Sequence, residues 1–325
     1  MKRFTGAFVL LFLVSAGLGA QPQPQPQDQT EPLIKVNVDL VSVLFSVRDK
    51  KGALMPNLTK DDFTILEDGK QQTIKDFVKE SDLPLTIGLL IDVSGSQQNL
   101  IGVEREAAGQ FFTRVLRQKD MAFLISFGSD AELLQDVTNS ARLLREGLSQ
   151  LRLSTSTMVG PHPGPVPNQK PRGTILFDAV SLASTEKLRG EVGRKAIVII
   201  SDGVDVGSSI NIQKAIEAAQ KADAVIYSIE YTDPRFAGFG GNGTGDLRRM
   251  SEETGGRLFR VDRKLSLNQI FDEIQNEMRS QFAIAYTPLN ANRDGNFRIV
   301  KIQPGNKDLK VQARKGYYAT ANSGQ

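Results

Sequence analysis

Five oxygen-bearing side chains stand where strand-length apolar runs end or where a helical segment begins: Asp92, Ser94, Ser96, Thr174 and Asp202. The first three follow the run LTIGLLI, the last follows KAIVIIS, and the threonine lies in a loop before a helical segment. In an open parallel sheet, ligands bind beyond the carboxyl ends of the strands. The spacing therefore predicts that these side chains meet at one edge of a sheet.

The chemistry of this set is that of a hard metal ion. Carboxylate and hydroxyl oxygens suit Mg²⁺, Mn²⁺ and Ca²⁺ and offer little to a soft metal. We expect Mg²⁺ in preference to Mn²⁺ or Ca²⁺. The two carboxylates balance the charge of a divalent cation and the hydroxyls are neutral, so the ion keeps an affinity for one more anionic ligand. We expect Gly95 to permit the tight turn that brings both serines inward.

The elements that position this set alternate between strands and helices from residue 85 to residue 281. Strands are predicted at LTIGLLID, MAFLISF, KAIVIIS, AVIYSIEY and RLFR, and helices at 99–117, 141–151, after Thr174, at 210–222, at 246–254 and from Leu267. Strands that are apolar throughout are typical of burial on both faces, and their alternation with helices predicts parallel pairing. The expected fold class is α/β, with a doubly wound, mostly parallel sheet flanked by helices.

Segments rich in β signals flank this region on both sides, at residues 34–80 and 282–319. In the first, strands Phe63–Glu67 and Gln71–Val78 are predicted around a turn at Asp68-Gly69, because both turn residues tolerate positive φ. In the second, three short strands are predicted, at 282–287, 297–302 and 309–314. The first flank is marginal in size for folding alone, and we expect the two flanks to lie together as one small sandwich.

The first residues have the order of a secretory signal peptide, predicted at residues 1–20. Lys2 and Arg3 precede an apolar run, which small residues follow up to Ala20. The run is shorter than the roughly 20 apolar residues that span a bilayer, and an N-terminal membrane anchor is the alternative. Residues 21–33 form a Gln/Pro-rich linker. The sequence therefore predicts export to the periplasm or outside the cell, with no transmembrane segment in the mature chain.

The composition excludes several other functions. The 325 residues include 40 Lys and Arg against 37 Asp and Glu, so without the predicted signal peptide the charge is close to neutral and gives no footprint for nucleic acid. There is no cysteine, which excludes disulfides and thiolate sites. The single histidine, His162, and the absence of a G-x-S-x-G motif leave zinc-protease and serine-hydrolase chemistry without their residues.

The pattern D-x-S-G-S at a strand end, a later threonine before a helix and a later S-D-G resembles the von Willebrand factor A (VWA) family. That family has a metal-ion-dependent adhesion site with these residue types in this order. The resemblance implies that Ser94 and Ser96 are direct ligands and that Thr174 binds directly or through water. It implies that Asp92 and Asp202 often bind through water. In family members that bind proteins, an acidic side chain of the partner completes the shell.

The resemblance begins at Leu85 and extends to about Leu265. The flanks also resemble a bacterial exported subfamily, through D-F-x-I-x-E-D-G before the α/β region and R-K-G-Y-Y-A after it. One departure from the family is a Pro-rich insertion at residues 153–173, just before Thr174, which either frames the metal face or has no function.

Two alternatives to this interpretation remain. Asp92, Ser94 and Ser96 could serve only as caps of the helix that follows. The glycines at residues 238–243, with Asp262 about twenty residues later, formally fit a dinucleotide-binding pattern. Because six residues including Pro234 separate these glycines from the preceding strand, a tight strand-to-helix turn is not expected there.

The function that this sequence predicts is a non-catalytic, divalent-cation-dependent module that binds a protein ligand presenting an acidic residue. One alternative is a structural envelope subunit whose metal only stabilises its loops. Another is a metal-dependent phosphoesterase with Asp92 as nucleophile, although the position two residues later is Ser94 and not the second aspartate of that enzyme class. The oligomeric state is left open.

Overall fold

The computed structural model describes residues 40–79, 83–154, 173–233, 235 and 243–319. These residues belong to the second of two compact units, which spans residues 39–325. The predicted signal peptide at 1–20, the linker at 21–33, nearly all of the Pro-rich insertion with His162, and the glycines at 238–242 lie outside the described residues. The described residues do not test those predictions.

A six-stranded sheet forms the centre of the α/β region, in the order β10-β9-β8-β5-β6-β7. Its strands are β5 (Leu85–Asp92), β6 (Met121–Phe127), β7 (Ala131–Thr138), β8 (Arg194–Ser201), β9 (Ala224–Glu230) and β10 (Leu258–Arg260). Neighbouring strands are parallel from β10 to β6, and β7 alone runs antiparallel to β6. All eight residues of β5 are buried, as its continuous apolar run predicts.

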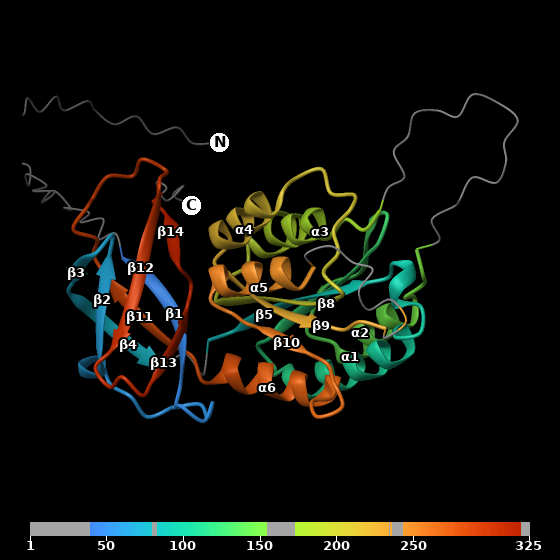
Figure 1. Ribbon diagram of the computed structural model, residues 1–325, viewed down its shortest axis with the longest axis horizontal. Helices are drawn as coiled ribbons and strands as arrows, with labels where there is room; N and C mark the ends of the chain where they lie inside the picture. The colour runs from blue at the N-terminus through green and yellow to red at the C-terminus, as the bar shows by residue number, and fades with distance from the viewer. Residues whose placement is uncertain (1–39, 80–82, 155–172, 234, 236–242, 320–325) are drawn as a thin grey trace, which may run out of the picture. The chain divides into compact units, whose positions relative to one another are not determined.

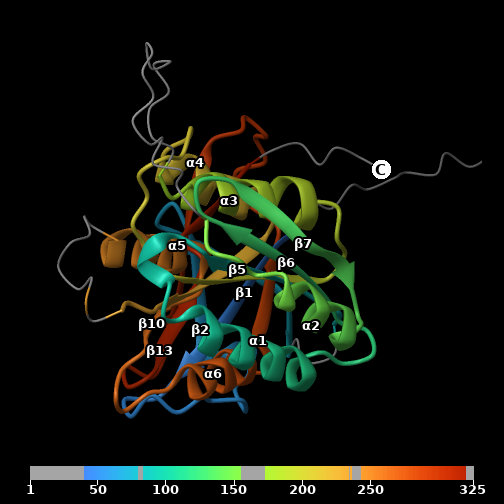
Figure 2. The ribbon, with the colours of Figure 1, turned by 90° about the vertical axis from the view of Figure 1, so that its right-hand side faces the viewer.

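Helices cover both faces of this sheet (Figures 1 and 2). One face carries α1 (Ile101–Val115), α2 (Ala141–Ser149) and α6 (Leu267–Arg279), and the other carries α3 (Leu176–Leu182), α4 (Ile212–Lys221) and α5 (Gly243–Thr254). Each face therefore has its own hydrophobic core. This arrangement confirms the predicted α/β fold class.

Strand β7 is an element that the sequence did not predict. Its segment, AELLQDVT, has a single fully buried residue and no regular alternation of apolar and polar residues. Its pairing with β6 is interrupted by register shifts near Leu124. Because β7 is an edge strand with mostly half-exposed side chains, neither of the usual strand signals is present.

The two flanks form a β-sandwich, which confirms that they lie together. One sheet has the order β13-β1-β11-β4 and the other has the order β14-β12-β2-β3. The first flank supplies β1 (Val41–Arg48), the 3₁₀ turn η1 (Lys60–Asp62), β2 (Phe63–Glu67), β3 (Lys70–Gln72) and β4 (Ile74–Lys79). The second supplies β11 (Phe282–Tyr286), β12 (Phe297–Pro304), β13 (Lys310–Ala313) and β14 (Gly316–Tyr318). Each flank contributes strands to both sheets, and the side chains between them make a third hydrophobic core.

The predicted hairpin is correct at its turn and wrong in its second strand. Asp68 and Gly69 have φ of 48° and 80°, as a two-residue turn between antiparallel strands requires. The segment predicted as one strand, Gln71–Val78, is divided between two sheets. Strand β3 pairs with β2, whereas β4 crosses to the other sheet and pairs with β11.

A buried carboxylate on α6 connects the sandwich with the α/β region. Glu277 is fully buried and accepts hydrogen bonds from Arg48 Nη2 at 2.6 Å, Arg257 Nε at 2.9 Å and Ser46 Oγ at 3.3 Å. These donors come from β1 and from the residue before β10. One side chain therefore holds three segments that are far apart in the sequence.

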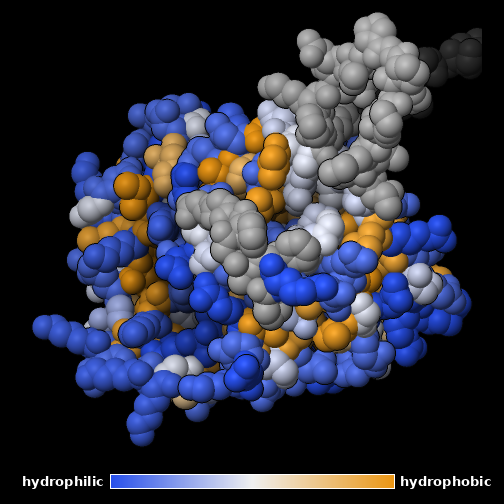
Figure 3. Space-filling model, turned by 45° about the vertical axis from the view of Figure 1, so that its right-hand side comes forward, coloured by the Kyte–Doolittle hydropathy of each residue, from blue (hydrophilic) through white to orange (hydrophobic). Residues whose placement is uncertain are grey.

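None of the helices in the described part of the chain has the length and apolar character needed to cross a bilayer. On the face of the molecule drawn in Figure 3, hydrophobic residues lie in separate groups among hydrophilic ones. The single exposed hydrophobic residues in this structure need no special explanation, since much of any protein surface is apolar.

Candidate metal centre

Asp92 is the last residue of β5, and its carboxylate is completely buried. Its Oδ1 accepts a hydrogen bond from the backbone N–H of Ser94 at 2.8 Å, and its Oδ2 accepts one from Ser201 Oγ at 2.6 Å. Ser201 Oγ in turn accepts from the backbone N–H of Gly203 at 2.8 Å. The ends of β5 and β8 are therefore joined through Asp92 and Ser201.

The two serines of the motif lie side by side in the loop after β5. Ser94 Oγ and Ser96 Oγ are 3.0 Å apart, at the start of the 3₁₀ turn η2 (Gly95–Gln97). The expectation about Gly95 is wrong: its φ lies outside the left-handed region, and a Cβ at this position would meet no atom within 4 Å. The 3₁₀ turn brings the serines together without any need for glycine.

Asp202 follows β8 directly, and its Oδ1 accepts a hydrogen bond from the backbone N–H of Val204 at 3.0 Å. Its negative charge contributes to raising the pKa of Asp92, which places the two carboxylates in one electrostatic environment. The glycine of this loop is required, because Gly203 has φ of 82° and a Cβ there would lie 2.4 Å from the carbonyl oxygen of Gly243.

Thr174 is held at the same edge through its backbone. Its carbonyl oxygen accepts hydrogen bonds from Val206 and Gly207, both at 3.0 Å, in the loop that follows Asp202. The next residue, Ile175, donates its N–H to the carbonyl of Gly128, just after β6. The structure thus places Asp92 at the end of β5 and the other four predicted residues in loops beyond the carboxyl ends of β5, β6 and β8, and contacts join Asp92, Ser94 and Ser96 directly. Their role as metal ligands stays a prediction.

The electrostatics of Asp92 fit a bound cation. Burial, and to a lesser extent the charge of Asp202, raises the pKa of Asp92 to about 6, although hydrogen bonds from Ser201 and Ser94 lower it. Its hydrogen-bond donors, Ser201 Oγ and the backbone N–H of Ser94, are neutral. A carboxylate in such a place favours a compensating positive charge. Among the described residues no group of three or more His, Cys, Asp or Glu side chains could share an ion, so a metal here depends on hydroxyl oxygens as well.

We predict that Mg²⁺ binding weakens as the pH falls through about 6, because protons then compete for Asp92. Below this value the affinity should fall about tenfold per pH unit. In the absence of metal, the free energy of unfolding depends on pH in the opposite direction. Because the folded-state pKa of Asp92 is raised, its contribution to stability is complete below the unfolded-state pKa of 3.8 and is lost as the pH rises through about 6. Calorimetric titration with Mg²⁺ from about pH 5 to pH 8 measures the effect. An affinity that does not change over this range would contradict the assignment of Asp92.

The structure adds three polar residues that the sequence analysis did not single out. Ser201 donates a hydrogen bond to Asp92 and so orients its carboxylate. The parallel register of β5 and β8 pairs Ile91 with Ile200, so Asp92 and Ser201, which follow them, lie side by side. Glu104 and Gln97 are fully buried near the same edge. Glu104 stands among apolar residues on the inner face of α1, which was a signal that a sequence can show.

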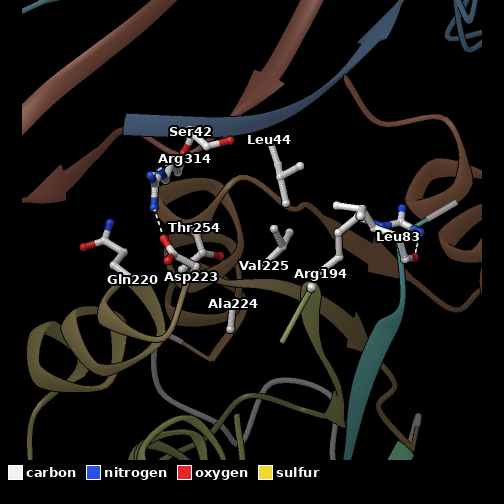
Figure 4. A pocket seen from close by; sticks show the side chains of 11 residues that line it. Ser42, Leu44, Leu83, Arg194, Gln220, Asp223, Ala224, Val225, Thr254 and Arg314 are labelled. Atoms are coloured by element: carbon white, nitrogen blue, oxygen red, sulfur yellow. Dashed lines mark hydrogen bonds and ion pairs between the residues drawn. The ribbon is translucent and has the colours of Figure 1, made fainter. Parts of the chain in front are cut away.

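A cavity of about 190 Å³ lies at the opposite ends of the strands (Figure 4). Arg194, Ala224 and Val225 at the starts of β8 and β9 line it, together with Asp223 and Arg314. The Arg314 guanidinium already pairs with Asp223 and donates to the carbonyl of Ser42. Because the parallel strands point away from this cavity, it is separate from the predicted metal residues.

Comparison with known proteins gives likenesses of fold. No model of a protein family matches the chain, and no curated protein matches it. Among solved structures, the conserved hypothetical protein BatB from Bacteroides thetaiotaomicron is similar over 60% of this chain and 97% of its own, with 18% identity and a TM-score of 0.42. A von Willebrand factor type A protein from Catenulispora acidiphila is similar over 86% of this chain and 75% of its own, with 10% identity and a TM-score of 0.47.

Proximal thread matrix protein 1 from the mussel byssus, in a structure with a zinc-occupied MIDAS motif, is similar over 66% of this chain and 50% of its own. Its identity is 12% and its TM-score is 0.47. At such identities the similarity concerns the fold alone. The resemblance of this chain to the VWA family therefore depends on the order of its own strands, helices and motifs.

Proposed function

We propose that this protein is a non-catalytic module that binds a protein ligand through a divalent cation. The observation that carries the proposal is the buried Asp92 carboxylate beside the paired hydroxyls of Ser94 and Ser96. Its hydrogen-bond donors are neutral, and a buried carboxylate is stabilised by a nearby positive charge. A hard cation supplies that charge and uses the hydroxyl oxygens as further ligands.

The charge of the set favours a partner that presents an acidic residue. Asp92 and Asp202 together neutralise one divalent cation, and Ser94, Ser96 and Thr174 add no charge. The cation therefore still attracts an anionic oxygen from outside. We infer Mg²⁺ as the cation, because the set offers few carboxylates and Mg²⁺ commonly keeps water and exogenous oxygen ligands. A carboxylate from the partner would then complete the coordination.

The burial of Asp92 supports a binding role over an enzymatic one. Hydrogen bonds from Ser201 Oγ and from the backbone of Ser94 fix its carboxylate in place. A nucleophile or general base must lie within reach of the substrate, whereas the Asp92 carboxylate is completely buried. We further propose that the mature protein works in the periplasm or outside the cell, since residues 1–20 have the order of a signal peptide.

The test combines Mg²⁺ titration with capture of partners from a cell-envelope extract. We expect the immobilised protein to retain a partner in Mg²⁺, to release it in EDTA, and to lose this retention in the double variant Ser94→Ala/Ser96→Ala. The matched control Ser149→Ala changes an exposed serine of α2 and should behave like the parent. Only a partner that EDTA elutes supports the proposal, because a chelator does not release proteins that bind non-specifically.

Two other outcomes would favour the alternatives. If Mg²⁺ raises the unfolding temperature but no partner is retained, the metal stabilises the loops of a structural subunit. If phosphate esters are hydrolysed in Mg²⁺ and the double variant abolishes this turnover, the site is catalytic. A chain that does not bind Mg²⁺ at all would overturn the proposed function.

A further inference from the structure

Glu104 is a buried acidic residue that the proposed metal site does not use. It lies in the first turn of α1, on the face that also carries the core residues Ile101, Ala108 and Phe111. Its side chain is completely buried, and neither carboxylate oxygen has a hydrogen-bond partner in the described part of the chain. A buried carboxylate without donors is costly, and proteins rarely keep one without a compensating charge or proton.

Gln97 contributes a third buried acceptor. Its side chain is fully buried, and its Nε2 donates to the carbonyl oxygen of Tyr231 at 3.2 Å. A carbonyl oxygen only accepts, so this contact fixes which end of the amide carries the nitrogen. The Oε1 atom therefore faces away from Tyr231, and it has no donor among the described residues.

These oxygens belong to one region at the carboxyl edge of the sheet, behind the predicted metal loop. Gln97 directly follows Ser96, and Tyr231 directly follows β9, where its N–H donates to the carbonyl of Ser201. Burial, and to a lesser extent the charge of Asp92, raises the pKa of Glu104 to about 9, so that a bound cation must displace a proton there. Burial, and to a lesser extent the charge of Glu104, raises the pKa of Tyr231. The side chain of Gln97 thus contacts Tyr231, and two backbone hydrogen bonds, from the Leu100 N–H to the Gln97 carbonyl and from the Glu104 N–H to the Leu100 carbonyl, place Glu104 two turns after Gln97.

We propose that Glu104 and Gln97 bind a monovalent hard cation, Na⁺ in an exported protein, at a site behind the divalent one. Three acceptor oxygens without donors suit a cation, which can satisfy all of them at once. One carboxylate balances one positive charge, so a monovalent ion leaves this buried region neutral. A divalent ion would leave an uncompensated charge there, close to the cation at Asp92.

Thermal unfolding in EDTA tests this site while the divalent site is kept empty. At constant ionic strength, replacing choline chloride with NaCl should raise the unfolding midpoint by about 3 °C or more, and the increase should saturate. The variant Glu104→Gln should lose this dependence on Na⁺. The matched control Glu106→Gln, an exposed position on the same helix, should retain it. The variant Asp202→Asn should retain it too, which separates this site from the proposed divalent centre.

Line broadening of the ²³Na resonance by the unchanged protein gives a second measurement that does not depend on the folding of a variant. We expect broadening that a Glu104→Gln sample of native fold does not produce. Equal midpoints in NaCl and choline chloride, with no ²³Na broadening, would overturn the proposal and leave Glu104 as a neutral, protonated acid. A stabilisation by Ca²⁺ or Mg²⁺ that Glu104→Gln removes, without any effect of Na⁺, would overturn it as well.

Discussion

The variant Asp92→Asn should bind Mg²⁺ about 100-fold more weakly than the parent, because mutating a residue that orients or supports the ligands of a metal site typically costs 10–100-fold in affinity. The metal-free variant should nevertheless be at least as stable as the parent near pH 8. Burial raises the pKa of Asp92 to about 6, so its charge opposes folding when no cation is present. Calorimetric titration and thermal unfolding in EDTA measure the two effects.

Weaker Mg²⁺ binding together with an undiminished stability of the metal-free protein distinguishes a metal-binding role of Asp92 from a structural one. A merely structural aspartate would show destabilisation without any link to Mg²⁺. The variant Asp308→Asn serves as the control, because Asp308 lies in the sandwich, is more than half exposed, and forms a surface ion pair with Lys50. It should leave Mg²⁺ affinity unchanged. Equal affinity in Asp92→Asn and the parent would remove Asp92 from the metal site.

The variant Glu277→Ala should lose about 3–5 kcal/mol of unfolding free energy, the usual cost of removing one partner of a buried ion pair. The Arg48 guanidinium would then remain near the core without its carboxylate, and the Arg257 guanidinium would keep its pair with Glu273. Urea unfolding, followed at equilibrium, measures the loss. We expect the midpoint to fall while the α/β region keeps its helices in the folded baseline.

An exposed ion pair provides the matched control for Glu277. Arg142 and Glu146 form an i,i+4 pair on α2 with both side chains more than half exposed. The variant Glu146→Ala should change the stability by less than about 1 kcal/mol, as exposed pairs usually do. A similar small change in Glu277→Ala would show that its contacts do not hold the segments together.

Much of the central sheet could be predicted from the sequence because its strands carry a strong signal. The runs of β5 and β8 are apolar at almost every position, and this pattern belongs to strands covered on both faces. The helix predicted from Leu267 likewise begins there, after a capping box of Ser266 and Gln269. The edge strand β7 could not be predicted, because its side chains are mostly half-exposed and its pairing is irregular, so its sequence shows no regular alternation of apolar and polar residues.

Part of the candidate site could likewise be predicted from the sequence, and part could not. The placement of Asp92, Ser94 and Ser96 at the end of β5 could be predicted, because the apolar run that they follow marks the strand, and their role as metal ligands stays a prediction. The hydrogen bond from Ser201 depends on which strands are neighbours, and this is a property of the sheet that no local pattern contains. Glu104 was missed because a charged residue in a helix is usually solvated, although its place among the apolar residues of α1 was a signal that it is buried.

The pairing of β1 with β11 and of β2 with β12 has a consequence for the order in which the protein can fold. During synthesis, β1 has no partner strand until more than two hundred further residues have emerged, since it ends at Arg48 and β11 begins at Phe282. Contacts so distant in sequence form slowly, because the chain must lose the entropy of closing a very long loop. The parallel sheet can assemble first and shorten that loop by bringing residues 85 and 281 close together. Until then, the unpaired early strands are the part of the nascent chain most exposed to aggregation.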